Sequence, residues 1–231
     1  MNGDAGAMSR ALRLATASPA WLRATVLALA AIAVAVILAL ANVAWFELLN
    51  GWLGLTEPLP RALLFSSFLL IVGGLVVVRE PAAYGLRIGS IRRHWRLVTG
   101  AIVTGAILPS LALRIGGSTP YAGASWVVEV VVVPFTEELV FRAVLLTALI
   151  SATRRLGFGP NAVLLAVAID AVAFGVAHAT NALSLAVAFV TLQVLFATLV
   201  GLGCAGLMAR TKSVYPAMAL HAVVNAVVVA M

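Results

Sequence analysis

The stretch "VVVPFTEELVFRAVL" at residues 131–145 combines the apolar character of a membrane helix with charged side chains. Glu137, Glu138 and Arg142 interrupt a run that is otherwise mostly apolar. On insertion scales each such group costs about 2.5–3.5 kcal/mol at the centre of a bilayer, and ionisable residues inside spans are functional candidates by default. The charged groups of this stretch are therefore the first candidates for a functional site.

The composition of the chain excludes an ordinary soluble fold. Of its 231 residues, 63% are hydrophobic and only 10% are charged, and the mean hydropathy is +1.12. Soluble domains contain about 45–50% apolar and about 25% charged residues. The sequence therefore predicts a polytopic membrane protein whose apolar surface is covered partly by lipid.

The net charge of +7 does not indicate a nucleic-acid partner. The basic residues lie between apolar runs instead of along one face, so the partners we expect are membrane lipids. The single cysteine, Cys204, lies within an apolar run. It leaves no intramolecular disulfide framework and no cysteine-based metal site, and we interpret it as a small packing residue.

Apolar segments of about 17–25 residues, the length at which a helix crosses a bilayer, follow one another along the chain. They predict an all-α fold: a polytopic transmembrane helix bundle with about seven spans and the candidate site within the last four. The first three spans form an N-terminal unit, 25–113, and the last four form a core, 125–231. The spans are placed at residues 25–46, 62–78, 97–113, 125–150, 161–179, 182–209 and 214–231.

The basic residues are unevenly divided between the loops. With the N-terminus inside, the outer loops hold only Arg61 and Arg114. By the positive-inside rule, we expect a multi-pass protein of the cell membrane with a cytoplasmic N-terminal segment, 1–24, and an external C-terminus. The basic segment 79–96 is expected to form an amphipathic surface helix or a loop, with Trp95 at the headgroup layer. The basic residues on the cytoplasmic side are Arg10, Arg13, Arg23, Arg79, Arg87, Arg92, Arg93, Arg96, Arg154, Arg155, Arg210 and Lys212.

A cleavable signal peptide is the alternative interpretation of the first span. It too would begin with basic residues and an apolar run, and "ALA" at residues 39–41 resembles a cleavage site. The apolar stretch is long for a signal peptide, so we retain the transmembrane interpretation.

Helical spacing separates the two neighbouring glutamates. Glu138 and Arg142 are four residues apart, so on a helix they share a face and can form an ion pair. Glu137 is rotated from Glu138 by about 100° and points elsewhere. One carboxylate can thus be neutralised structurally while its neighbour stays free for chemistry.

Two later spans carry polar pairs at the same spacing. Phe174 and His178 are four residues apart, and so are His221 and Asn225. Each of these polar groups taken alone is better explained structurally, as an ion pair or as an interhelical hydrogen bond. Asp170 is interpreted as a hydrogen-bond acceptor, Glu129 as a solvated residue near the outer end of its span, and Phe174 as a packing residue.

Taken together, the pairs form three ordered motifs: EExxxR in "EELVFR" (137–142), FxxxH in "FGVAH" (174–178) and HxxxN in "HAVVN" (221–225). This order resembles the CPBP family, also called the Abi or CAAX-protease family, whose members include type II CAAX prenyl endopeptidases. The resemblance covers residues 125–231, and the first three spans carry no recognised motif. It implies an intramembrane endopeptidase acting on a membrane-associated or lipidated peptide.

The resemblance also implies roles for these residues. Glu137 would act on a water molecule together with His178, while His221 and Asn225 would stabilise the oxyanion or join the same polar cluster. Glu138, Arg142 and Phe174 would support them. A base, an orienting imidazole and two donors are what peptide hydrolysis through a tetrahedral oxyanion requires.

Whether a metal takes part is left open by the sequence. Glu137, His178 and His221 could bind Zn²⁺ and leave a fourth position for water. The chain has no HExxH motif, however, and the ligands would come from three separate helices. We therefore expect no cofactor for the chemistry, with a divalent metal such as zinc as the alternative.

Counting residues along straight helices places the candidate groups at different depths. At about 1.5 Å per residue, the depth from the inner membrane edge is about 20 Å for Glu137, about 27 Å for His178 and about 12 Å for His221. Helix tilt, a bend at Pro134 or a fifth span that protrudes inward is needed to bring them together.

Two other functions are compatible with these residues. A transporter or proton-relay protein would use Glu137, Asp170 and the histidines as a conduction path, but it would spread polar residues through the bundle and often contain an inverted repeat. A catalytically silent family member could serve as a membrane scaffold or an immunity protein. The intact motifs favour the endopeptidase.

Overall fold

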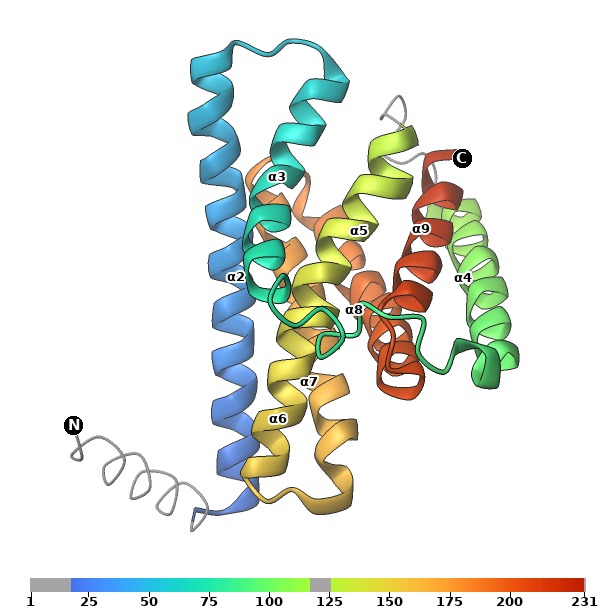
Figure 1. Cartoon of the computed structure of the whole chain (residues 1–231). Coiled ribbons are helices and arrows are strands. Elements are labelled where there is room, and N and C mark those ends of the chain that lie inside the picture. The colour runs from blue at the N-terminus through green and yellow to red at the C-terminus, as the bar shows by residue number, and fades with distance from the viewer. Residues whose placement is uncertain (1–17, 117–125, 231) are drawn as a thin grey trace, which may run out of the picture.

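The computed structural model describes residues 18–116 and 126–230, and among them helices are the only regular secondary structure (Figure 1). The predicted all-α helix bundle is therefore confirmed. The α-helices are α2 (Ala20–Leu53), α3 (Pro58–Val77), α4 (Trp95–Gly116), α5 (Val133–Glu138), α6 (Thr147–Arg155), α7 (Ala162–Ala177), α8 (Val187–Thr211) and α9 (Tyr215–Ala230). Short 3₁₀ turns form η1 (Ile91–His94), η4 (Gly159–Asn161) and η5 (His178–Leu183), and π-helical turns form η2 (Val128–Val132) and η3 (Leu139–Leu146).

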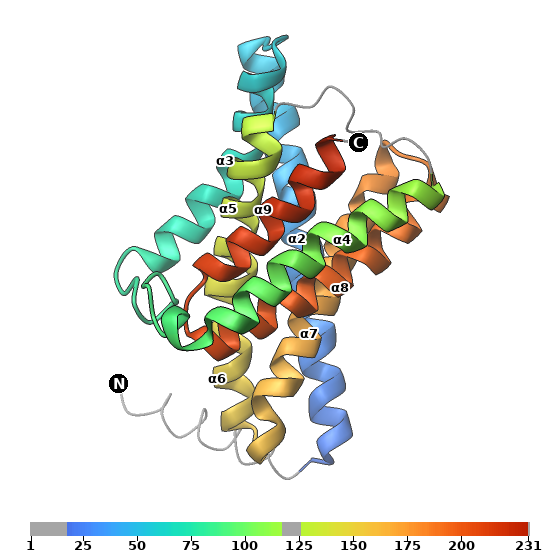
Figure 2. The same cartoon turned by 90° about the vertical axis from the view of Figure 1, so that its right-hand side faces the viewer.

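The helices form a bundle with α2 at one edge and α4 at the other (Figure 1). Helix α7 packs on α8 and on α2, whereas α4 packs mainly on α9. The hairpin of α6 and α7 and the first half of α2 project beyond the remaining helices at one end of the molecule (Figure 2). The bundle interior therefore lies between α5, α7, α8 and α9, with α2 and α3 along one side.

Length and composition identify four candidate membrane spans among the described residues: Ala20–Leu53, Leu59–Val77, Gly159–Leu183 and Val187–Thr211. Large apolar side chains such as Leu29, Leu75 and Leu164 are exposed on the bundle surface, as expected for a surface that faces lipid. The chain is a membrane protein. The number of seven spans and the orientation stay predictions, and residues 1–17 of the predicted N-terminal segment lie outside the described part.

The first predicted span and the basic segment 79–96 take definite forms in the structure. Helix α2 begins at Ala20 and ends at Leu53, so it extends the predicted span 25–46 at both ends. The basic segment 79–96 is mostly a loop with the short turn η1. Both the backbone N–H and the hydroxyl of Ser90 donate to the carbonyl of Thr211 at 3.0 Å, which fixes this loop to the turn between α8 and α9.

Small residues bring α7 and α8 close together. A Cβ atom on Gly175 would lie 2.8 Å from the carbonyl oxygen of Val194 and would also collide with Thr198 Oγ1. A Cβ on Gly201 would lie 3.2 Å from the Cα of Ala171. Close backbone approach at small residues is how helices associate in membranes, and here it positions the helix that ends at His178.

Residues 126–155 form one continuous rod built from η2, α5, η3 and α6. The short α-helix α5, which carries Glu137 and Glu138, lies between the two π-helical segments. Wide π turns are rare and occur frequently at functional sites. The rod therefore marks the EExxxR motif as a special position of the backbone as well as of the side chains.

Candidate active site

A buried ion-pair cluster centres on Arg142. Its Nε atom lies 3.0 Å from Glu138 Oε2, and its Nη1 donates a hydrogen bond of 2.7 Å to Asp170 Oδ2. All three side chains are fully buried. The pair between Glu138 and Arg142 is the one that the four-residue spacing predicts, and Asp170 accepts a hydrogen bond as expected, but as the second carboxylate of the same cluster.

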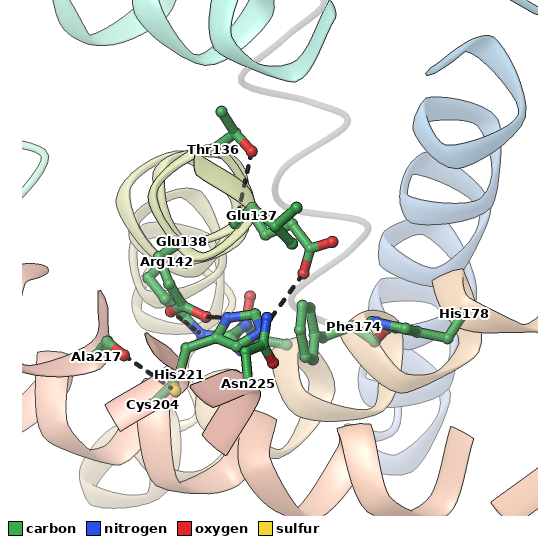
Figure 3. A network of polar contacts seen from close by, with 12 residues as sticks. Thr136, Glu137, Glu138, Arg142, Phe174, His178, Cys204, Ala217, His221 and Asn225 are labelled. Carbon is green, nitrogen blue, oxygen red and sulfur yellow. Dashed lines mark hydrogen bonds and ion pairs between the residues drawn. The ribbon is translucent and has the colours of Figure 1, made fainter. Parts of the chain in front are cut away.

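His221 extends this cluster towards Glu137. Its Nδ1 lies 3.0 Å from Glu138 Oε1, and its Nε2 lies 3.8 Å from Glu137 Oε2 (Figure 3). An ionised carboxylate only accepts hydrogen bonds, so the proton of this bond is on Nδ1. Glu138 therefore fixes the orientation of the imidazole and directs its other nitrogen towards Glu137.

The two neighbouring glutamates have different surroundings. The side chain of Glu138 is fully buried against Arg142 and His221, whereas that of Glu137 keeps 20% of its surface exposed. Glu137 Oε2 accepts no hydrogen bond from any residue that the structure describes. Glu137 is thus the carboxylate of the pair that remains available for a reactant.

Phe174 separates the two histidines of the motifs. Its ring centroid lies 4.9 Å from that of His178 and 5.7 Å from that of His221, with both contacts edge to face (Figure 3). His178 Nδ1 donates to the carbonyl oxygen of Phe174 at 2.9 Å, which leaves Nε2 as the acceptor of a neutral imidazole. No hydrogen bond or ion pair joins His178 to Glu137 among the described residues; the residue that the structure brings next to Glu137 is His221.

Asn225 holds the backbone of the rod at its first π turn. Its Nδ2 donates to the carbonyl oxygen of Glu129 at 2.8 Å. In this turn the N–H of Val133 bonds to the carbonyl of Val128, five residues back. The next donor in that pattern would be Pro134, which has no N–H, so Asn225 supplies the hydrogen bond that the proline cannot. The second N–H of the amide remains for another acceptor.

The three motifs line one cavity of about 670 Å³. The residues of the motifs on its wall are Glu137, Phe174, His178, His221 and Asn225. Helices α2 and α3 form another part of the wall. The structure therefore brings the predicted site residues of the three motifs to one space, while Glu138 and Arg142 lie behind them in the protein.

The residues proposed for zinc are not arranged as a metal site. Among the residues that the structure describes, no group of three or more His, Cys, Asp or Glu side chains is close enough to hold a metal ion. Glu137 and His221 are neighbours, but His178 lies on the far side of Phe174 (Figure 3). The arrangement in this structure does not fit a tetrahedral Zn²⁺ bound by these three groups.

Comparison with known proteins places the three motifs in a family. Residues 119–227 match the family described as type II CAAX prenyl endopeptidase Rce1-like. Residues 119–227 are thus CAAX-protease-like. No curated protein and no solved structure matches the chain.

The match to the CAAX-protease family indicates a general function. The matched residues run from the rod 126–155 to near the end of α9 and leave α2, α3 and α4 outside. At the level of the family, this match supports a CAAX-protease-like membrane endopeptidase. The mechanism and the substrate require further argument from the site.

Sequence reasoning missed polar groups that come from outside the motifs. Asn42 on α2 and Ser66 on α3 line the cavity, and the pair of Asn181 and Gln193 lies on its wall with an amide hydrogen bond of 2.9 Å. Polar residues in apolar spans are the signal that could have found Asn42, because such residues are costly in lipid. Nothing in the sequence shows which helix faces they share with the motifs.

Proposed function

We propose that the chain hydrolyses a peptide bond of a membrane-associated or lipidated substrate inside this cavity, with Glu137 as the general base. The observation that supports the proposal is the position of Glu137, a partly exposed carboxylate on the cavity wall with His221 Nε2 at 3.8 Å. A carboxylate that lacks a hydrogen bond from the described residues can bind and deprotonate a water molecule.

The reaction begins with a water molecule bound to Glu137 in the cavity that His178 also lines. The carboxylate takes a proton from the water, and the oxygen attacks the carbonyl carbon of the substrate. Neutral His178 orients the water, since its Nδ1–H is held by the Phe174 carbonyl and its Nε2 can accept a hydrogen bond. When the C–N bond breaks, Glu137 returns the proton to the leaving amine.

The tetrahedral oxyanion is stabilised by His221 and Asn225. As an imidazolium, His221 donates from Nε2 while Nδ1 stays bonded to Glu138, and the carboxylates on both sides balance its charge. Asn225 adds the N–H that Glu129 does not use. Donors fixed before the reaction are the largest contribution to catalysis of this kind.

The buried cluster behind the site has a supporting role in this mechanism. Arg142 holds Glu138 and Asp170 holds Arg142, so the orientation of His221 depends on charged groups that never contact the substrate. Phe174 keeps the two imidazoles apart. No step passes through a metal, because Glu137, His178 and His221 are not grouped as ligands. Removing divalent ions with a chelator is therefore expected to leave the turnover number unchanged.

The assignment is tested with purified protein in proteoliposomes. A fluorogenic farnesylated peptide with a CAAX-type C-terminus is the first probe, and membrane peptides of cells expressing wild-type protein or Glu137→Ala extend the search to other substrates. Glu137→Gln and His178→Ala are each expected to lower turnover by at least about 10²-fold. Glu47→Gln, which changes an exposed acid of α2, is the matched control. Wild-type turnover in either site variant overturns the mechanism, and a folded wild-type protein without peptide products supports the scaffold or immunity function instead.

We also propose that the N-terminal segment 1–24 is cytoplasmic and that residues 125–231 form the catalytic core. The test of orientation is labelling with a membrane-impermeant thiol reagent applied to intact cells. A cysteine at Ile88, which is 72% exposed in the loop that bonds to Thr211, is expected to resist the reagent. A cysteine at exposed Ser184 is expected to react. The native Cys204 is buried, and the reverse labelling pattern would show that the orientation is inverted.

A further inference from the structure

The cavity has a second wall that lies outside the family match. It is made by α2 and α3, whose cavity-facing side chains are mostly apolar, for example Leu38 and Leu69. Asn42 on α2 and Ser66 on α3 interrupt this apolar wall. Both residues are only 3% exposed, so they are polar groups enclosed by protein at the edge of the cavity.

Asn42 has no hydrogen-bond partner in the part of the chain that the structure describes. Its Oδ1 is buried and accepts no hydrogen bond. Burying an amide without a hydrogen bond destabilises a protein, and asparagine in a membrane helix usually bonds across a helix interface. Asn42 therefore costs stability in the free protein and does not hold α2 to its neighbours by a hydrogen bond.

The other amides of the cavity are all occupied. Asn181 and Gln193 bond to each other, and Asn225 bonds to the carbonyl of Glu129. Arg61, the charged residue on the α3 part of the wall, donates to the carbonyl of Leu55. Asn42 lines the same cavity but differs from each of these residues, because its side chain makes no hydrogen bond among the described residues.

An unused amide acceptor and a hydroxyl on one cavity wall favour a particular kind of ligand. A lipid chain offers no hydrogen bond and would leave Oδ1 of Asn42 unsatisfied. A peptide main chain offers N–H donors and carbonyl acceptors in alternation, so it can satisfy both an amide oxygen and the hydroxyl of Ser66. Sites built to hydrogen-bond a polar group discriminate strongly against ligands that lack it.

We propose that Asn42, together with Ser66 of the same cavity wall, forms a subsite that binds the main chain of the substrate peptide, with Oδ1 of Asn42 accepting one backbone N–H. This inference rests on the proposed function, because it takes a peptide as the molecule in the cavity. It assigns to α2 and α3 the alignment of the peptide, while the motifs on α5, α7 and α9 carry out the hydrolysis.

The experiment pairs a change in the protein with a change in one atom of the peptide. Binding of the farnesylated CAAX-type peptide to Glu137→Gln protein is measured without turnover, using a series in which one backbone amide at a time is replaced by an ester. An ester removes a single N–H donor. At one position the ester is expected to weaken binding about tenfold, and in the Asn42→Leu background the same ester is expected to have no effect.

Asn50 supplies the matched control. It lies on the same helix, its Oδ1 also lacks a partner, and it does not line the cavity. Asn50→Leu is expected to leave the ester effect intact. Both leucine variants are expected to raise the melting temperature in detergent, because each removes a buried amide oxygen without a hydrogen bond.

The outcomes separate the subsite from the proposed function. If peptides bind and are cleaved but no ester effect depends on Asn42, the subsite is wrong and the proposed function stands. If no peptide binds the Glu137→Gln protein and none is cleaved by wild type, both are wrong. A lower melting temperature for Asn42→Leu would identify Asn42 as a structural residue and would also reject the subsite. Where a leucine variant does not fold, the absence of any ester effect in unaltered Asn42 protein still rejects the subsite.

Discussion

Helices α2 and α7 are both apolar enough to cross a membrane, yet they differ in what surrounds them. Of the most apolar window of Ala20–Leu53, 11% is buried inside the protein, against 56% for Gly159–Leu183. The helix enclosed by protein carries Asp170, Phe174 and His178, and its charged group is paired with Arg142. The helix open to lipid carries Asn42, a polar group without a partner.

The difference shows how the molecule divides its tasks. Charged groups are placed where helices enclose them and where each carboxylate meets a cation or an imidazole. This arrangement fixes the reactive side chains before any substrate arrives. The outer helices make one side of the cavity without ion pairs to the motifs, and they lie outside the family match. In the proposed function, chemistry belongs to the core and selection of the substrate to the wall beside it.

The largest effect is expected from the buried cation of the core. Arg142→Gln leaves Glu138 and Asp170 buried without their common partner, and the expected loss of stability is about 3–5 kcal/mol. Thermal unfolding in detergent measures the effect. Adding Glu138→Gln is not sufficient for rescue, since Asp170 remains charged and buried; only the triple variant with Asp170→Asn is expected to recover part of the loss. Full recovery in the double variant would show that Asp170 is not part of the cluster.

The two neighbouring glutamates are expected to respond in opposite ways. Glu138→Gln weakens the ion pair with Arg142 and the bond to His221, so the melting temperature falls. Glu137→Gln changes a carboxylate whose Oε2 accepts no hydrogen bond from the described residues and lies 3.8 Å from His221 Nε2, and the melting temperature is expected to stay the same or rise while turnover is lost. A destabilised Glu137→Gln together with a stable Glu138→Gln would show that the roles are reversed.

A smaller effect is expected at the contact between α7 and α8. Gly175→Ala introduces a methyl group against the Val194 carbonyl, and overpacking of this kind costs about 1–3 kcal/mol. Gly206→Ala in α8 is the control, because a Cβ there meets no atom within 4 Å; it is expected to stabilise the helix by about 0.5–1 kcal/mol. Equal melting temperatures for the two variants would show that α7 is not held by close approach to α8.

The smallest effect is expected on the lipid-facing side of α2. Leu29 is 61% exposed on α2, so Leu29→Ala is expected to change stability by less than about 0.5 kcal/mol. Leu146→Ala in the core removes a fully buried side chain and is expected to cost about 2–5 kcal/mol. Unfolding of both variants in detergent sharpens the comparison of the two regions. A comparable loss at Leu29 would mean that α2 packs against protein on that face.

Composition and helical spacing predicted the parts of this structure that depend on one helix at a time. The all-α membrane fold follows from the apolar runs, and the pair of Glu138 with Arg142 follows from their four-residue separation. Contacts between helices could not be predicted in the same way. The hydrogen bond that Arg142 donates to Asp170 spans 28 positions, and the one between His221 and Glu138 spans 83. No periodicity within a single span predicts either bond.

Counting along straight helices with a common start placed the site residues at different depths, and a protruding fifth span was one of the expected ways to bring them together. The hairpin of α6 and α7 projects beyond the other helices (Figure 2), so α7 begins further out than the count assumed. The rod 126–155 also contains two π-helical segments. In the sequence only Pro134 indicated that this helix would be distorted. These features bring Glu137, His178 and His221 to one cavity.

The hydrogen bond from Asn225 to the Glu129 carbonyl changes how an inactive variant at Asn225 must be interpreted. Alanine at this position removes the proposed donor to the oxyanion. It also removes the hydrogen bond to the Glu129 carbonyl in the proline-interrupted turn that precedes Glu137. The resulting defect would therefore combine two causes, and its size would overstate the part due to chemistry. Pro134→Ala restores a backbone N–H to that turn. In this background the hydrogen bond to the Glu129 carbonyl is expected no longer to depend on Asn225. The activity that Asn225→Ala still loses in this background is the share that belongs to the reaction itself.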